Sequence, residues 1–204
     1  MTPSAVLAEI PAVKATRLEA FSDGVIAIII TIMVLELKVP HDTSVHALVE
    51  RWPVFFSYLL SFLMVAIYWV NHHHLIHLAR HVNAGVLWAN MFLLFCLSLV
   101  PFVTAFLGES RANSLPVALY GIVTMACAAA FYLLRSVIAW QTRDDAQMRH
   151  LHECMLKKNR IAIGIFTASL LVACWLPWLA LVLIAVPHLM YFVPDREVEK
   201  IRLE

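Results

Sequence analysis

The sequence predicts an all-α membrane protein with six transmembrane helices per protomer. Its 204 residues are 62% hydrophobic and only 14% charged, and the mean hydropathy is +0.80. A soluble protein this apolar would have too little polar surface to cover its core. The apolar residues fall into six segments, and the Lys and Arg residues gather on alternate connections between them.

We expect one domain over residues 1–204, with helices at about 18–38, 53–80, 84–107, 115–140, 161–175 and 176–193. Pro101 predicts a kink or a frayed end near the outer end of the third helix. Residues 142–160 are interpreted as a solvated amphipathic connection. Trp175 to Trp178 leave almost no loop between the last two helices, which predicts a tight helical hairpin.

The distribution of basic residues predicts the orientation in the membrane. Six spans put both termini, the second connection and the fourth connection on one side. That side carries Lys14, Arg17, Arg80, Arg143, Arg149, Lys157, Lys158, Arg160, Arg196, Lys200 and Arg202, whereas the other side has Lys38, Arg51 and Arg111. Positive residues favour the cytoplasmic side, so both termini are expected there.

The first helix has more ionisable groups than a simple lipid anchor needs. Thr16 and Glu19 stand at the spacing of a capping box. Asp23 and Glu36 are separated by roughly 20 Å of helix, which is less than the ~30 Å hydrocarbon layer. An ionisable group at membrane depth normally faces protein or water. Asp23 is therefore expected to have a partner on another helix.

Candidate partners lie on the second and third helices. The second contains Trp69, Asn71 and the run His72-His73-His74, and the third contains Trp88 and Asn90. His73 and His77 are four residues apart, so a metal site is conceivable if His81 supplies a third ligand. The run of histidines is a weak signal, however, and hydrogen-bonded interhelical histidines are the preferred interpretation. Proton sensing or relay remains an alternative.

Both faces of the first helix are apolar between Gly24 and Leu35. One face, here named the Ile28 stripe, consists of Ile28, Thr31, Ile32 and Leu35; the other consists of Val25, Ile26, Ile29, Ile30 and Met33. Periodicity alone does not say which face meets a pore, another helix or lipid. Small residues beside the Ile28 stripe mildly favour it as the packed or pore side.

The sequence gives little support to other classes of protein. The formal net charge of +1 does not indicate nucleic-acid binding. The four cysteines are scattered, which favours free thiols. We find no phosphate-binding Gly-rich loop, no nucleophile elbow and no HExxH motif, so an enzyme, a catalytic residue, a resident metal or a cofactor is not expected.

The residues Arg17-x-x-x-Phe21-Ser22-Asp23 match the RxxxFSD signature of the transmembrane protein 175 potassium-channel family. Two further stretches resemble that family: Trp69-x-Asn71-His72-His73, and the region from Trp88-x-Asn90 to Pro101-Phe102. The resemblance is good over the first half of the chain. The last three helices agree only in number and length.

The resemblance implies a potassium-preferring cation channel without a TVGYG filter, and none occurs here. It implies the prokaryotic form, in which four protomers form a homotetramer with four first helices around the pore in the inner cell membrane. The constriction would be Ile28, Ile32 and Leu35, with Thr31 as a polar residue lining the pore. Potassium and other monovalent cations would be the permeant ions. The motif residues Arg17, Phe21, Ser22 and Asp23 would be structural, tied to His72 or His73 and Asn90, and Trp69 would belong to the same network.

Two other classes remain open. A proton-coupled or His-rich secondary transporter would use Asp23 and the histidines as a relay, but no inverted repeat is found. A membrane scaffold or partner subunit would not conduct ions. Passive flux down a K⁺ gradient would separate the channel from both.

Overall fold

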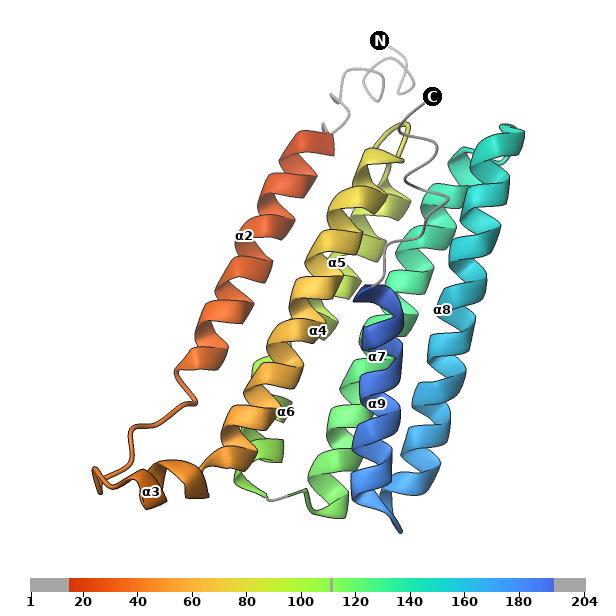
Figure 1. Ribbon diagram of the computed structural model, residues 1–204. Coiled ribbons are helices and arrows are strands. Elements are labelled where there is room, and N and C mark those ends of the chain that lie inside the picture. Colours follow the sequence, from red (N-terminus) through yellow and green to blue (C-terminus); the bar gives the residue numbers. More distant parts are fainter. Residues whose placement is uncertain (1–14, 111, 193–204) are drawn as a thin grey trace.

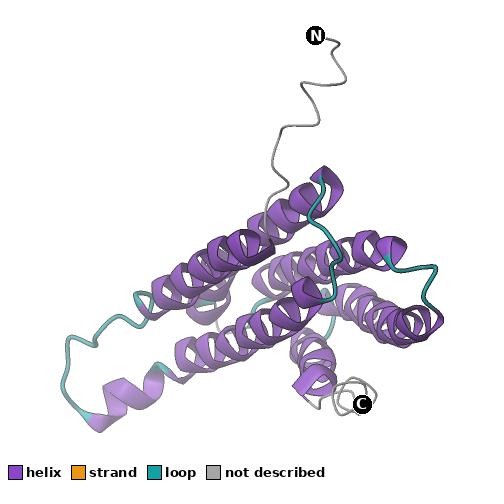
Figure 2. Cartoon of the chain, turned by 90° about the horizontal axis from the view of Figure 1, so that it is seen from above, coloured by secondary structure: helices purple, strands orange, loops and turns teal. Residues whose placement is uncertain are grey.

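The computed structural model describes residues 15–110 and 112–192, and the elements in these ranges are helices. They are α2 (Ala15–Val34), α3 (Val45–Glu50), α4 (Trp52–His77), α5 (Ala84–Ser98), α6 (Val100–Glu109), α7 (Ser114–Gln141), α8 (Ala146–Ala173) and α9 (Pro177–Phe192). The chain runs down along α2 in Figure 1 and up along α4, and then down through α5 and α6. It rises along α7, descends along α8 and turns up again into α9 (Figures 1 and 2).

Three helical segments in the described ranges are long and apolar enough to cross a membrane. They are Trp52–His77, Ala84–Glu109, which joins α5 and α6, and Ser114–Gln141; Pro177–Tyr191 is shorter but apolar. Helix α2 has Arg17, Glu19 and Asp23 in its first turns, and α8 has Lys157, Lys158 and Arg160 near its middle. These charges keep α2 and α8 less apolar than the other long helices.

The third apolar segment is interrupted near Pro101, as expected. Helix α5 ends at Ser98 and α6 begins at Val100, with Pro101 in its first turn. Proline has no N–H to donate to the carbonyl of Leu97, and its ring clashes with that carbonyl. The break therefore falls just before the proline.

Helix α8 differs most from the sequence prediction. Residues 146–160 were expected to be a connection, but they form the first half of a 28-residue helix. The carboxylate of Asp145 accepts a hydrogen bond from Met148 N at 3.1 Å, which satisfies one of the free N–H groups at the helix start. Leu151, Met155, Ala162 and Phe166 are all buried and continue one apolar stripe along the helix. Packing of this stripe makes the polar half helical.

The other helix boundaries shift by smaller amounts. Helix α2 begins at Ala15, so Thr16 lies inside the helix and does not cap it. The same helix ends at Val34 rather than near 38, followed by a tight turn in which Leu35 N bonds Ile32 O at 3.0 Å. The sequence analysis missed α3, which is capped by Ser44. Hydrogen bonds from Ser44 lower the pKa of the nearby Asp42 carboxyl.

Interhelical contacts hold the bundle together around α7, which packs against α5, α6, α8 and α9. Tyr120, Leu134 and Ile138 of α7 are fully buried. A buried polar cluster links three helices: Ser61 Oγ lies 3.0 Å from Tyr120 Oη and 2.7 Å from Thr104 Oγ1. Helix α2 lies at one side of this bundle, where it contacts α4, α5 and α6 (Figure 1).

Candidate functional site

Helix α2 buries one face against its own protomer. The buried residues recur every three or four positions and are Leu18, Ser22, Ile26, Ile29 and Met33. This spacing places them along one side of an α-helix. Three large side chains in the set, Ile26, Ile29 and Met33, are only 1%, 4% and 0% exposed. The face of α2 that packs on α4, α5 and α6 is therefore a row of apolar side chains with one polar residue, Ser22, among them.

The Ile28 stripe lies on the uncovered side of α2 and continues to Leu35 in the turn that follows the helix. Ile28, Ile32 and Leu35 are 58%, 44% and 72% exposed. Thr31 is also exposed, and its Oγ1 lies 3.0 Å from the carbonyl oxygens of both Ala27 and Ile28. The described part of the protomer leaves this apolar stripe unpaired.

Behind that stripe, Ser22, Asn90 and His72 form a buried polar node that links α2, α5 and α4. Asn90 Nδ2 donates to Ser22 Oγ at 2.9 Å, and Asn90 Oδ1 lies 2.7 Å from His72 Nε2. Ser22 Oγ in turn donates to Leu18 O at 2.8 Å. All three side chains of the node are 0% exposed. Each of these predicted network residues thus contacts at least one other across a helix interface.

Asp23 has the interhelical partner that its depth requires. The indole Nε1 of Trp69, on α4, donates to Asp23 Oδ1 at 2.9 Å. A carboxylate that accepts a hydrogen bond at a helix interface is less unfavourable than one facing lipid. Asp23 therefore links α2 to α4, and the adjacent residue Ser22 links α2 to α5 through the polar node.

Arg17 and Phe21 differ from the expectation. They were expected to be tied to His72 or His73 and Asn90, but both side chains are exposed, Phe21 by 54%. Phe21 precedes Ile28 by seven residues and Arg17 precedes it by eleven, close to two and three helical turns. They therefore lie on the uncovered side of α2, away from the polar node.

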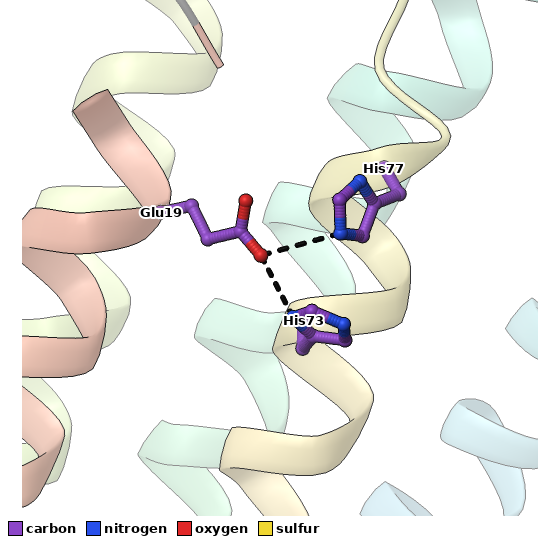
Figure 3. A group of neighbouring side chains, drawn as sticks. All are labelled: Glu19, His73 and His77. Carbon is purple, nitrogen blue, oxygen red and sulfur yellow. Dashed lines mark ion pairs between the residues drawn. The ribbon is translucent and has the colours of Figure 1, made fainter. Parts of the chain in front are cut away.

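A second cluster lies one turn from the node. The sequence indicated its two histidines but not its carboxylate. Glu19 Oε1 of α2 lies 2.7 Å from His73 Nδ1 and 3.3 Å from His77 Nε2, both on α4 (Figure 3). The two imidazole rings meet nearly edge to face, with centroids 4.6 Å apart. Glu19, and not His81, joins the two histidines. The spacing of His73 and His77 could be read from the sequence, whereas their pairing with Glu19 required the packing of α2 on α4.

Comparisons with known proteins place the chain in a family. The family of the endosomal/lysosomal potassium channel TMEM175 matches residues 17–101. A potassium channel of a Chryseobacterium species is 41% identical over 184 residues, covering 90% of this chain and 95% of that protein. A potassium channel of Chamaesiphon minutus is 33% identical over 175 residues, covering 80% of this chain and 86% of that protein.

The fold agrees as well. The crystal structure of a lysosomal potassium-selective channel TMEM175 homolog from Chamaesiphon minutus superposes with a TM-score of 0.78 at 30% identity. The match covers 87% of this chain and 95% of that one. The predicted family resemblance is confirmed by these matches, and the chain belongs to the TMEM175 family of potassium channels, which are multi-pass membrane proteins.

Proposed function

We propose that this protein is a potassium-preferring, weakly selective cation channel with a hydrophobic constriction and no TVGYG filter. Four protomers form a homotetramer, and the α2 helix of each lines the pore. Ile28, Ile32 and Leu35 form successive apolar rings, and Thr31 adds a hydroxyl beside the first of them. Potassium and other monovalent cations are the permeant ions.

One observation carries the proposal: α2 packs one face into the protomer and leaves the Ile28 stripe uncovered. An exposed apolar stripe on a soluble protein would be an interaction surface. In a membrane protein, such a stripe meets either lipid or another copy. The small residues Gly24 and Ala27 border the stripe, and a Cβ built on Gly24 meets nothing within 4 Å. A smooth surface of this kind allows helices to approach one another closely.

The chemistry of the stripe accounts for weak selectivity. Isoleucine offers no oxygen to replace the hydration shell of an ion, so each permeating ion must keep most of its water or lose solvation energy. K⁺ holds its water less tightly than Na⁺ and therefore passes more easily. The hydroxyl proton of Thr31 is directed to carbonyls of its own helix, which leaves its oxygen available as an acceptor.

The path of the chain supports six membrane spans, with α5 and α6 together forming the third. The start of α2, the connection after α4 and the start of α8 lie at one end of the bundle (Figure 1). Arg80, Arg143, Arg149 and Lys157 all belong to that end or to the polar half of α8. The positive-inside rule then makes this end cytoplasmic and places both termini there, in the inner (plasma) membrane of a prokaryotic cell.

The test is a bi-ionic reversal potential measured on the purified protein in a bilayer, comparing wild type with Ile28→Asn. We expect the asparagine ring to let water and ions pass more freely, which raises the current and moves the K⁺/Na⁺ reversal potential toward zero. Val34→Asn is the matched control. Val34 is 47% exposed on the same helix, but it lies about 120° around the axis from Ile28. An unchanged reversal potential in Ile28→Asn, or an equal change in Val34→Asn, would contradict the constriction.

Liposome flux separates the channel from the other two classes. Passive K⁺ flux without a proton gradient is expected of a channel. A proton-coupled transporter would need the gradient, and a scaffold would show no flux in either condition.

A further inference from the structure

We propose that Glu19, His73 and His77 form a binding site for a divalent transition-metal ion such as Zn²⁺. The site joins the beginning of α2 to the end of α4. It is distinct from the Ile28 stripe and is not needed for ion permeation.

The geometry of the three ligand atoms fits one ion. Glu19 Oε1 lies 2.7 Å from His73 Nδ1 and 3.3 Å from His77 Nε2, and all three atoms lie within 4.8 Å of one another. Zn²⁺ binds nitrogen and oxygen ligands at about 2.0–2.2 Å, so two ligands of a tetrahedral ion are about 3.4 Å apart. Side-chain movements of about 1 Å would bring the three atoms from their present separations of 2.7 Å to at most 4.8 Å to that spacing. Figure 3 shows both rings directed at the same oxygen.

The type of ligand indicates which ion would bind. Two imidazole nitrogens and one carboxylate are a ligand set that suits Zn²⁺ and other transition metals. Mg²⁺ and Ca²⁺ prefer oxygen ligands throughout and are therefore poor candidates. The ligand set equally distinguishes this site from any site for permeating K⁺, because nitrogen ligands do not favour a large monovalent cation.

The site is open to an ion from solution. The side chains of His73 and His77 are 40% and 54% exposed, while Glu19 is 15% exposed. Three protein ligands leave a fourth tetrahedral position for water. The carboxylate is held against α4 and the two rings stand one helical turn apart, so little conformational entropy is lost when the ion binds. Bound metal would add a link between α2 and α4 beside the Asp23–Trp69 hydrogen bond.

The experiment is a calorimetric titration of ZnCl₂ into the full-length, metal-stripped protein in detergent. Cys154 and Cys174 are exposed and able to bind zinc, so all variants carry Cys154→Ser and Cys174→Ser. We expect about one Zn²⁺ per chain in this background, and at least tenfold weaker binding in His77→Gln and in Glu19→Gln. MgCl₂ should give no binding at this site.

His46→Gln is the matched control, because His46 and Glu50 are also four residues apart and close, at 3.8 Å, but belong to no three-ligand group among the described residues. This variant should bind Zn²⁺ as the background protein does. Equal affinity in His77→Gln and the background, or a loss confined to His46→Gln, would overturn the site. Glu19→Gln keeps the shape of its side chain, so it tests the same site should His77→Gln not fold. Because binding is measured without ion flux, the result is independent of whether the channel conducts.

Discussion

Replacing Asn90 with alanine removes the central residue of the polar node and should destabilise the protein strongly. Asn90 donates to Ser22 Oγ at 2.9 Å and contacts His72 Nε2 at 2.7 Å. Ser22 retains its bond to the carbonyl of Leu18 in the variant. His72 has no second hydrogen bond of this kind, because its Nδ1 lacks a partner among the described residues. The variant therefore leaves a fully buried imidazole without a hydrogen bond.

The expected loss follows from these contacts. Interhelical side-chain hydrogen bonds in membrane proteins contribute about 0.6 kcal/mol each, and at most about 1.7 kcal/mol. An unsatisfied buried polar group costs about 1–3 kcal/mol more. Two lost bonds and one stranded His72 give a total of about 3 kcal/mol. For a chain of 150–250 residues, this corresponds to a thermal midpoint lower by roughly 6–12 °C.

The assay is thermal and denaturant unfolding of the purified variants in one detergent. Asn71→Ala is the matched control. Among the described residues, the hydrogen bond of Asn71 Nδ2 goes to Ile67 O of its own helix, at 2.8 Å, and the residue is half-buried. That variant should lose about 1 kcal/mol or less, because alanine favours the helix and no other helix loses a partner. Equal losses in Asn90→Ala and Asn71→Ala would refute the argument that the node links three helices.

Three further results are expected. Gly108→Ala should destabilise the protein by about 1–3 kcal/mol, because the new Cβ would lie 2.6 Å from Ser57 Oγ and 3.0 Å from Val54 Cα. The control is Gly164→Ala, which should be neutral or stabilising because a Cβ there meets nothing within 4 Å. Equal unfolding midpoints in the two variants would contradict the close α4–α6 contact. Trp69→Phe should lower the free energy of unfolding by about 1 kcal/mol through loss of the bond to Asp23, and Asp23→Asn should add little to that loss in the double variant; additive losses would show that the two residues are not partners. A membrane-impermeant maleimide applied to right-side-out vesicles should label Cys174 but not Cys154. Both are exposed, but they stand about 30 Å apart along α8 and the turn after it, so the proposed orientation puts Cys154 toward the cytoplasm and Cys174 toward the outside. Labelling of Cys154 alone would reverse that orientation.

The sequence predicted the helices best where the signal is local. The long apolar segments, the break near Pro101 and the tight turn after Ala173 depend on residues close together in the chain. The first half of α8 was missed because hydropathy falls at its Lys and Arg residues, while the buried stripe of Leu151 and Met155 depends on packing that hydropathy does not record. Short α3 was missed because six residues carry too little periodicity.

The sequence indicated which residues make the interhelical hydrogen bonds of α2, but not how those residues pair. Each of five residues named in the sequence analysis has a direct hydrogen bond to a residue of another helix: Ser22, Asp23, Trp69, His72 and Asn90. Which residue pairs with which depends on the rotation of α2 and α4 about their axes. The same rotation places Arg17 and Phe21 outside the node and brings Glu19 to His73.

The polar node explains how α2, whose stretch from Gly24 onward is apolar on both faces, acquires a defined orientation. Ile26 and Ile29 on the buried face and Ile28 and Ile32 on the other have the same chemistry, so apolar packing alone would accept several rotations of α2. A rotation by one residue, about 100°, would carry Ser22 away from Asn90 and leave the amide without its partner in an apolar interior, which costs about 1–3 kcal/mol. Buried polar residues set register in this way when the surrounding surface is uniform. The hydrogen bond between Ser22 and Asn90 favours one rotation of α2 about its axis, and in that rotation the Ile28 stripe is uncovered. Neither residue belongs to that stripe.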